Sequence, residues 1–269
     1  MSALAVVELD RTTSEGWDKP AKPRELGTVA GLRFVASGVE LAAWRGGARA
    51  WWHRCGANPR AVHVSEDRLL VLTDSRDYHA WGHLGPALLL DLRTGDRLAE
   101  LRGDRAAAVD GGRFVLGLEG YGIFETWLHD RDGALLTTWH TYGHYVPDAD
   151  GVRVVECDRR SPTASRLARL LPDGELERGD RLRNGQAAEP VVLPDGTLVV
   201  LDAGVLLAVG HDLRAAVLAE VVDVGADPWQ FWGTVELRGD VLVVTAYEHV
   251  RDVSVFLTHR VRYALTGVA

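Results

Sequence analysis

The sequence has few of the residues that hold small secreted or metal-dependent domains together. Its 269 residues include two cysteines, Cys55 and Cys157, which form no spacing motif. A disulfide framework of the secreted kind is therefore not expected. Histidine pairs spaced four apart, such as His79 and His83, fall in expected loops rather than on a helix that would aim both rings at one ion. We expect no metal site.

The common catalytic and cofactor motifs are also absent. The sequence contains no Gly-x-Ser-x-Gly, no phosphate loop, no Gly-x-Gly-x-x-Gly and no Cys-x-x-Cys. Paired carboxylates such as Asp148 and Asp150 stand in a turn pattern and are interpreted as turn formers. We therefore expect no cofactor, and no residue is assigned a catalytic role.

Long apolar runs and excess positive charge are missing too. No segment approaches 18 uninterrupted apolar residues, and the N-terminus lacks the basic and apolar regions of a secretion signal. The net charge is −8, which disfavours nucleic acid or an anionic membrane as a partner. Lysine occurs only at Lys19 and Lys22 while arginine is abundant, a composition typical of a GC-rich bacterial genome. The expectation is a soluble, cytoplasmic bacterial protein.

Helical periodicity is lacking, and short β-type runs bounded by Gly, Asp and Pro fill the chain. Two series of turn residues interleave, and each recurs about every 40 residues, a period typical of propeller blades. The first series is Gly46-Gly47, Thr94-Gly95, Asp132-Gly133, Asp173-Gly174 and Asp212-Leu213. The second is Ala30-Gly31, Glu66-Asp67, Gly111-Gly112, Asp150-Gly151, Asp195-Gly196 and Gly239-Asp240. Two turns per period predict four strands per repeat, named a to d from the inside outward.

This pattern predicts an all-β chain whose residues 1–269 form a single β-propeller domain of six four-stranded blades. Residues 27–269 hold the blades, residues 11–26 are linker-like, and the strand at 3–9 is left over. Because the sixth blade lacks an outer strand, we expect residues 3–9 to complete it and close the propeller. The expected blades span Leu26–His53, Pro59–Gly103, Asp104–Tyr142, Gly143–Leu182, Arg183–Val222 and 223–269.

Two stretches resemble known propeller repeats. Residues Leu89–Leu98 are similar to the strand c, turn and strand d of a WD40-like repeat, and Gly143-His144 stands where such repeats carry Gly-His. The Trp-Asp pair of those repeats is replaced by Leu90-Asp91 in the second blade. The chain thus resembles WD40-like and quinoprotein-like propellers, and the resemblance implies the propeller fold.

Aromatic and histidine residues gather in the loops of one expected face. The a–b and c–d turns are short and polar, whereas the b–c and d–a loops are long and aromatic. The b–c segment Asp74–Pro86 is longer than a repeat needs, which favours a functional role. The candidate binding residues are Tyr78, His79, Trp81, His83, His140, Tyr142, Tyr145, Asp158, Trp229, Trp232, Glu248 and His249.

Two functions fit this face. The first is a binding module for a protein partner or a small-molecule ligand, with aromatic side chains as anchors. The alternative is a small-molecule enzyme that uses histidines and carboxylates at the mouth of the central channel. For Trp51 and Trp139, which alternate with apolar residues in strand d, packing between blades competes with a binding role. Binding is favoured because no nucleophile or cofactor signature appears.

Overall fold

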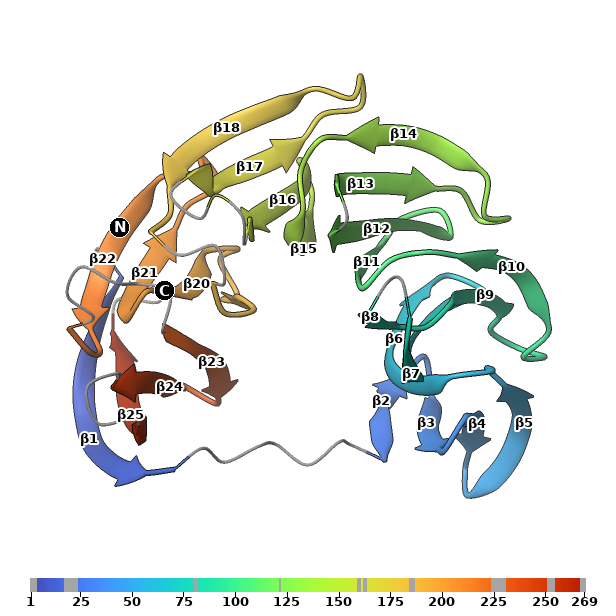
Figure 1. Ribbon diagram of the computed structural model, residues 1–269, viewed down its shortest axis with the longest axis horizontal. Helices are drawn as coiled ribbons and strands as arrows, with labels where there is room; N and C mark the ends of the chain where they lie inside the picture. Colours follow the sequence, from blue (N-terminus) through green and yellow to red (C-terminus); the bar gives the residue numbers. More distant parts are fainter. Residues whose placement is uncertain are drawn as a thin grey trace. The chain divides into compact units, whose positions relative to one another are not determined.

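The computed structural model describes residues 4–16, 24–79, 82–120, 122–158, 161, 164–183, 187–223, 231–250 and 255–266. Side chains are not described at 76–79, 82–83 and 231. Within these ranges the chain is all β, with no α-helix (Figure 1). Consequently none of the described residues belongs to a helix that could span a membrane.

The strands form six antiparallel sheets, which are the blades of a β-propeller. Blade 1 consists of β2 (Glu25–Val29), β3 (Leu32–Ser37), β4 (Glu40–Arg45) and β5 (Ala48–Arg54). Blade 2 consists of β6 (Asn58–Ser65), β7 (Arg68–His79), β9 (Ala87–Asp91) and β10 (Arg97–Leu101), with the short β8 (Gly82–Leu84) added to β7. Blade 3 consists of β11 (Arg105–Val109), β12 (Arg113–Gly120), β13 (Ile123–His129) and β14 (Leu135–Trp139).

The second half of the chain repeats this order. Blade 4 consists of β15 (Gly143–Asp148), β16 (Gly151–Glu156), β17 (Arg166–Leu170) and β18 (Leu176–Arg181). Blade 5 consists of β19 (Val191–Val192), β20 (Leu198–Asp202), β21 (Val205–Val209) and β22 (Ala215–Glu220). Blade 6 consists of β23 (Phe231–Arg238), β24 (Val241–Val250), β25 (Val255–Thr266) and β1 (Ala5–Glu15). These blades confirm the predicted six-bladed, all-β fold.

The N-terminal strand completes blade 6, as predicted. It pairs antiparallel with β25, from Ala5 opposite Thr266 to Glu15 opposite Leu257. It is longer than the expected 3–9, because β25 is itself long and offers partners along its whole length. Residues 11–15, which read as part of a linker, are therefore strand.

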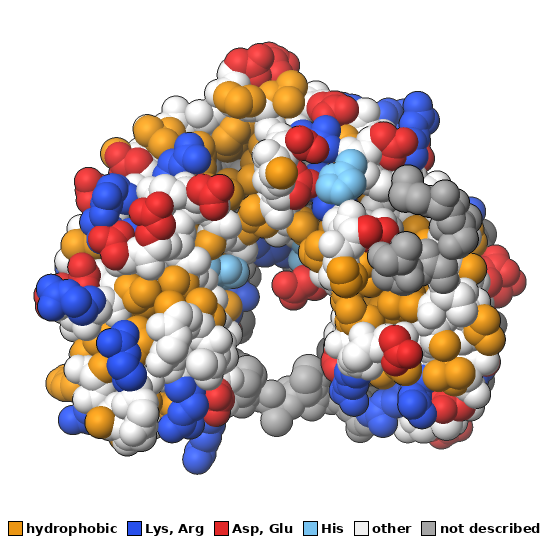
Figure 2. All heavy atoms as spheres, turned by 180° about the vertical axis from the view of Figure 1, so that it is seen from behind, with side chains coloured by type: hydrophobic (Ala, Val, Ile, Leu, Met, Phe, Trp, Pro, Cys, Tyr) orange, Lys and Arg blue, Asp and Glu red, His pale blue; other side chains and the backbone are white. Residues whose placement is uncertain are grey.

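The chain divides into two compact units, which are described separately. Unit 1 comprises Met1–Lys19, Arg153–Arg169 and Leu176–Ala269. Unit 2 comprises Pro20–Val152 and Leu170–Glu175, and so contains blades 1 to 3 entire. In unit 2 the blades pack through buried apolar residues, with Phe34, Leu41 and Leu69 among those shared by blades 1 and 2. Acidic, basic and apolar side chains are mixed over the described surface that Figure 2 shows.

The long b–c segment of blade 2 is not an open loop. Strand β7 continues to His79, and β8 returns beside it with His79 opposite Gly82 and Asp74 opposite Leu84. The described part of the segment thus extends the blade as two antiparallel strands, with an irregular register between Asp74 and His79. Gly85 then packs tightly, since an added Cβ there would lie 2.2 Å from the Thr73 hydroxyl oxygen.

Candidate binding groove between blades 2 and 3

A tryptophan from strand d joins blade 1 to blade 2. Trp51 is 7% exposed, and its indole Nε1 donates to the Leu92 carbonyl oxygen in the β9–β10 turn at 2.9 Å. The ring lies directly on Gly95 of that turn, where a Cβ would be 2.6 Å from the ring atom Cε3. The sequence places glycine there because the turn needs a φ of +76° and leaves no space for a side chain.

The same contact recurs between blades 3 and 4. Trp139 is 4% exposed, and its Nε1 donates to the Leu171 carbonyl oxygen at 2.8 Å. Leu171 lies in the turn between β17 and β18, and both residues belong to unit 2. The interpretation of Trp51 and Trp139 as packing between blades is therefore confirmed.

Between blades 2 and 3 the equivalent position is Leu101. It is the last residue of β10 and pairs with Ala87, as Trp139 ends β14 and pairs with Thr126. Leu101 reaches the next turn as Trp51 does, since a Cβ on Gly133 would be 3.6 Å from Leu101 Cδ2. A leucine is much smaller than a tryptophan, and the space beside it is open.

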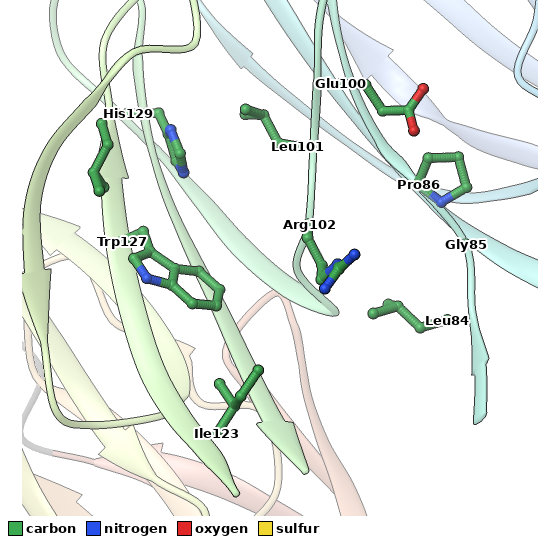
Figure 3. Close-up of a pocket in the computed structure, with 10 residues that line it drawn as sticks. Leu84, Gly85, Pro86, Glu100, Leu101, Arg102, Ile123, Trp127 and His129 are labelled. Atoms are coloured by element: carbon green, nitrogen blue, oxygen red, sulfur yellow. The ribbon is translucent and has the colours of Figure 1, made fainter. Parts of the chain in front are cut away.

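A groove of about 620 Å³ occupies this space. Figure 3 shows the Arg102 side chain between the wall that carries Trp127 and Ile123 and the wall that carries Leu84 and Pro86. This volume is in the range of ligand and side-chain binding sites in proteins. The lining residues are Leu84, Gly85, Pro86, Glu100, Leu101, Arg102, Ile123, Trp127, His129 and Leu135.

Strand alternation places one wall of the groove. Ile123, Trp127 and His129 are at odd positions of β13 and share one face of blade 3. The even position Thr126 faces the other way and hydrogen-bonds the Tyr145 hydroxyl at 2.8 Å. Trp127 is only half-buried, so part of its ring is available to a ligand. Leu135 of β14, 56% exposed, continues the apolar lining to the surface.

Hydrogen bonds and close packing fix the backbone of the turn that carries Arg102. The backbone N–H of Asp104 donates to the Gly117 carbonyl at 2.9 Å, and the Tyr142 hydroxyl donates to Asp104 Oδ2 at 2.8 Å. Burial raises the pKa of the Asp104 carboxyl, and the hydrogen bond from Tyr142 opposes this rise. Gly103 is packed against Leu116, with 3.1 Å between the atom Cβ of Leu116 and a Cβ added to the glycine. Arg102 is therefore presented from a fixed backbone.

His129 is the titratable ring of the groove. Its Nδ1 lies 3.0 Å from the Gly133 carbonyl oxygen, which favours the tautomer that donates from Nδ1. Burial lowers the pKa of His129, while this backbone contact and the Asp130 charge oppose the change. The imidazole is thus neutral at neutral pH and adds an uncharged surface to the groove.

Three of the predicted binding residues lie near one another behind β13. His140 is exposed, 3.4 Å from Glu125 Oε1, and its ring meets Phe124 edge-on at 5.5 Å. Tyr142 and Tyr145 are buried, at 1% and 8% exposure. Their proposed role as exposed anchors is corrected, because their hydroxyls bond Asp104 and Thr126 inside the fold. Burial also raises the pKa of both phenols.

Three further predicted residues lie together in blade 6 of unit 1. Trp232 is 6.3 Å from the Tyr247 ring and 5.9 Å from that of Phe256, and His249 stacks on Phe256 at 4.5 Å. Glu248 instead pairs across the sheet with a histidine that the sequence did not single out, His259, whose Nε2 is 2.9 Å from Glu248 Oε2.

His259 also fixes the N-terminal strand. Its Nδ1 lies 3.0 Å from the Thr13 hydroxyl of β1, so hydroxyl, imidazole and carboxylate form one chain across three strands. The arrangement ties β1 to the blade. Elsewhere in unit 1, Asp158 Oδ1 accepts the Ser161 backbone N–H at 3.0 Å, which shapes the loop after β16.

Five of the predicted site residues have no described side chain. Trp81 and Trp229 lie outside the described residues, as do the side chains of Tyr78, His79 and His83. Strand β8 nevertheless ends at Leu84, which lines the groove. Across the part of the chain that the structure describes, no group of three His, Cys, Asp or Glu side chains is arranged to hold a metal ion.

Solved structures with similar folds were found at low sequence identity. The extracellular domain of the one component system BT4673 from B. thetaiotaomicron has a TM-score of 0.51 and 11% identity, covering 90% of this chain and 40% of that one. BamB from Moraxella catarrhalis has a TM-score of 0.47 and 14% identity, covering 85% and 81%. BBS1N, crystallised in complex with ARL6DN, has a TM-score of 0.47 and 14% identity, covering 89% of each chain.

These likenesses concern the fold alone. No family model and no curated protein sequence matches the chain. The six four-stranded sheets themselves identify the fold as a β-propeller, and the kind of repeat is not assigned.

Proposed function

We propose that this chain is a protein-binding module that holds a short segment of a partner protein in the groove between blades 2 and 3. The observation that carries the proposal is the groove itself, about 620 Å³ in volume and walled by Trp127 and other apolar side chains. Propellers serve binding and catalysis alike, so the site rather than the fold supports this function.

The lining fits recognition of a polypeptide. Apolar side chains form most of the walls, Arg102 lies between the walls, and Glu100 adds a negative charge on the side of Pro86. Binding sites for protein segments typically combine an aromatic or aliphatic pocket with a polar rim. The volume suits one or two side chains, which favours an extended segment over a folded domain.

The groove favours binding over the enzymatic alternative. Its histidine, His129, contacts the Gly133 carbonyl with Nδ1, and the same burial that lowers its pKa reduces its proton uptake near neutral pH. General acid–base catalysis works best with a group whose pKa lies near the working pH. His129 instead supplies a neutral surface.

The predicted face and the groove are neighbours. Leu84 follows the β7–β8 extension, Arg102 begins the d–a loop of blade 2, and Ile123 follows the b–c turn of blade 3. These are the loop classes that the sequence singled out. The proposal therefore keeps the binding face and moves its centre to the gap between two blades.

The test is selection of binding peptides from a random displayed library, followed by affinity measurement on single variants. Trp127→Ala should weaken the selected peptides at least about tenfold, since buried aromatic anchors contribute on the order of 2 kcal/mol. Trp52→Ala is the matched control, because Trp52 is 53% exposed on blade 1 and away from the groove. Circular dichroism checks that each variant folds. Failure to enrich any peptide, or peptides indifferent to Trp127→Ala, would overturn the proposal.

A further inference from the structure

The groove stands at a position where the neighbouring blades hold a tryptophan. Resting on the proposed function, we infer that the anchor of the bound segment is a tryptophan side chain. It would fill the space beside Leu101 as Trp51 and Trp139 fill the equivalent spaces within the chain.

The first support is register. Trp139 pairs with Thr126, four residues before Asp130 at the end of strand c. Leu101 pairs with Ala87, four residues before Asp91 at the same place in the preceding blade. The two side chains therefore occupy one structural position, and the repeat carries a leucine where its neighbour carries an indole.

The second support is the turn that receives the side chain. A Cβ on Gly95 would lie 2.6 Å from the Trp51 ring. A Cβ on Gly133 would lie 2.6 Å from Ala99 Cβ and 3.6 Å from Leu101 Cδ2. In both places strand d of one blade packs onto a glycine of the next. The blade 2–3 contact is thus formed in the same way, with smaller side chains.

The third support is a hydrogen-bond acceptor. The carbonyls that accept the indole N–H, those of Leu92 and Leu171, lie three residues before the turn glycines Gly95 and Gly174. Asp130 lies three residues before Gly133.

The Asp130 and Leu171 carbonyls are used alike within their turns. The Leu171 carbonyl accepts both the Gly174 N–H at 3.1 Å and the Trp139 indole at 2.8 Å. The Asp130 carbonyl accepts the Gly133 N–H at 3.1 Å, and among the described residues no tryptophan donates to it. A carbonyl oxygen has two lone pairs, so the same turn can accept an external indole N–H.

These features select tryptophan over other apolar side chains. Phenylalanine fills less of the space and has no N–H for the Asp130 carbonyl. Trp127 and Ile123 give an incoming ring an apolar surface on the blade 3 wall, and the Arg102 side chain lies between the two walls. A bound indole therefore buries more apolar area than leucine or phenylalanine, and it makes a hydrogen bond that those side chains cannot make.

The experiment uses the full chain and the peptides selected for it. We expect the peptides to share a tryptophan, and its replacement by phenylalanine to weaken binding at least about tenfold. N1-methyltryptophan, which keeps the ring and removes the donor, should also bind several times more weakly. On the protein side, Leu101→Trp should fill the groove from within and abolish binding, whereas Leu98→Trp, at an exposed position of the same strand, should not.

The outcomes separate this inference from the proposed function. Peptides that depend on Trp127 but lack tryptophan, and that bind Leu101→Trp as they bind the native chain, would overturn the tryptophan anchor and leave the binding module standing. If no peptide binds, both fail. The N1-methyltryptophan comparison needs no change in the protein, so it decides the question even where Leu101→Trp does not fold.

Discussion

The contacts between blades 1 and 2 and between blades 3 and 4 differ from the contact between blades 2 and 3 at one side chain. In the first two, Trp51 and Trp139 lie buried against the next turn and donate to its carbonyls. In the third, Leu101 reaches the same kind of turn, and a groove remains open beside it. Repeated blades thus acquire a site where one repeat departs from the pattern of its neighbours.

A second cavity differs from the groove in the strands that line it. It holds about 500 Å³ between blades 3 and 4, and its lining includes Trp139, Val109 and Pro147. The lining of that cavity comes from the inner strands β11, β12, β15 and β16 and also from Leu128, Trp139 and Leu170 of outer strands. The described lining of the groove comes from β8, β10, β13, β14 and the adjoining turns. Trp139 is buried at the wall of its cavity, whereas Leu101 is half-buried beside the groove.

The largest expected effect is the loss of folding stability when a tryptophan that packs between two blades is replaced. Trp139→Ala should lower the free energy of unfolding by about 3–5 kcal/mol, because it removes a buried ring and leaves a cavity. Trp139→Phe should cost less, since the ring is largely kept while the hydrogen bond to Leu171 is lost. Urea denaturation measures both, with the exposed Trp52→Ala as the control. If Trp139→Ala left the free energy of unfolding unchanged, the comparison between the tryptophan and leucine contacts would lose its basis.

The next effect concerns the turn glycine under Trp51. Gly95→Ala should cost about 2–4 kcal/mol, because it adds backbone strain at positive φ and a clash with a ring held by a hydrogen bond. Gly47→Ala is a matched control in the corresponding turn of blade 1, with φ +86° and nothing within 4 Å of the added Cβ. It should show the strain alone, about 1 kcal/mol. Equal losses in the two variants would mean that the Trp51 contact adds nothing.

The fold could be predicted from sequence because its signals are local and repeated. Turn glycines and aspartates such as Asp132-Gly133 recur once per blade, and their backbone demands do not depend on distant contacts. The leftover N-terminal strand followed from counting strands. Its true end at Glu15 did not, since the length of the pairing depends on the partner strand β25.

The site was harder to predict because exposure depends on neighbouring blades. Tyr142 and Tyr145 have the composition of exposed anchors, yet Asp104 and Thr126 hold them inside. Leu101 carries no chemical signal of its own. Only the alignment of blade 2 with blade 3, which puts Trp139 at its position, marks it as a place where a tryptophan is replaced.

A smaller effect is expected at Leu101 itself. Leu101→Ala should cost about 1–2 kcal/mol, less than Trp139→Ala, because the side chain is half-buried and faces an existing opening. The substitution should also enlarge the groove. A ligand with a larger aromatic group should then bind Leu101→Ala more tightly than it binds the native chain. Thermal unfolding of the two variants side by side gives the ranking. A loss at Leu101 as large as that at Trp139 would show that the groove wall is a core contact.

The smallest effect is the pH dependence of the groove, and it follows from His129. Burial lowers its pKa in the folded chain, so the folded chain binds fewer protons than the unfolded chain below the ordinary histidine pKa of about 6.5. This contribution to stability is complete above that pH and is lost as the pH falls through the folded pKa. A segment seated in the groove removes more water from the imidazole and disfavours its charged form further. Affinity should therefore be highest above neutral pH and weaken as the pH falls, by less than about tenfold.

Titration calorimetry at two pH values measures this pH dependence of affinity. His129→Gln should flatten the dependence, while His211→Gln, which changes an exposed histidine of unit 1, should leave it unchanged. Affinity that rises on acidification would show that the ligand pairs with a charged imidazole, and the groove would then recognise an acidic group at His129 instead of a neutral ring.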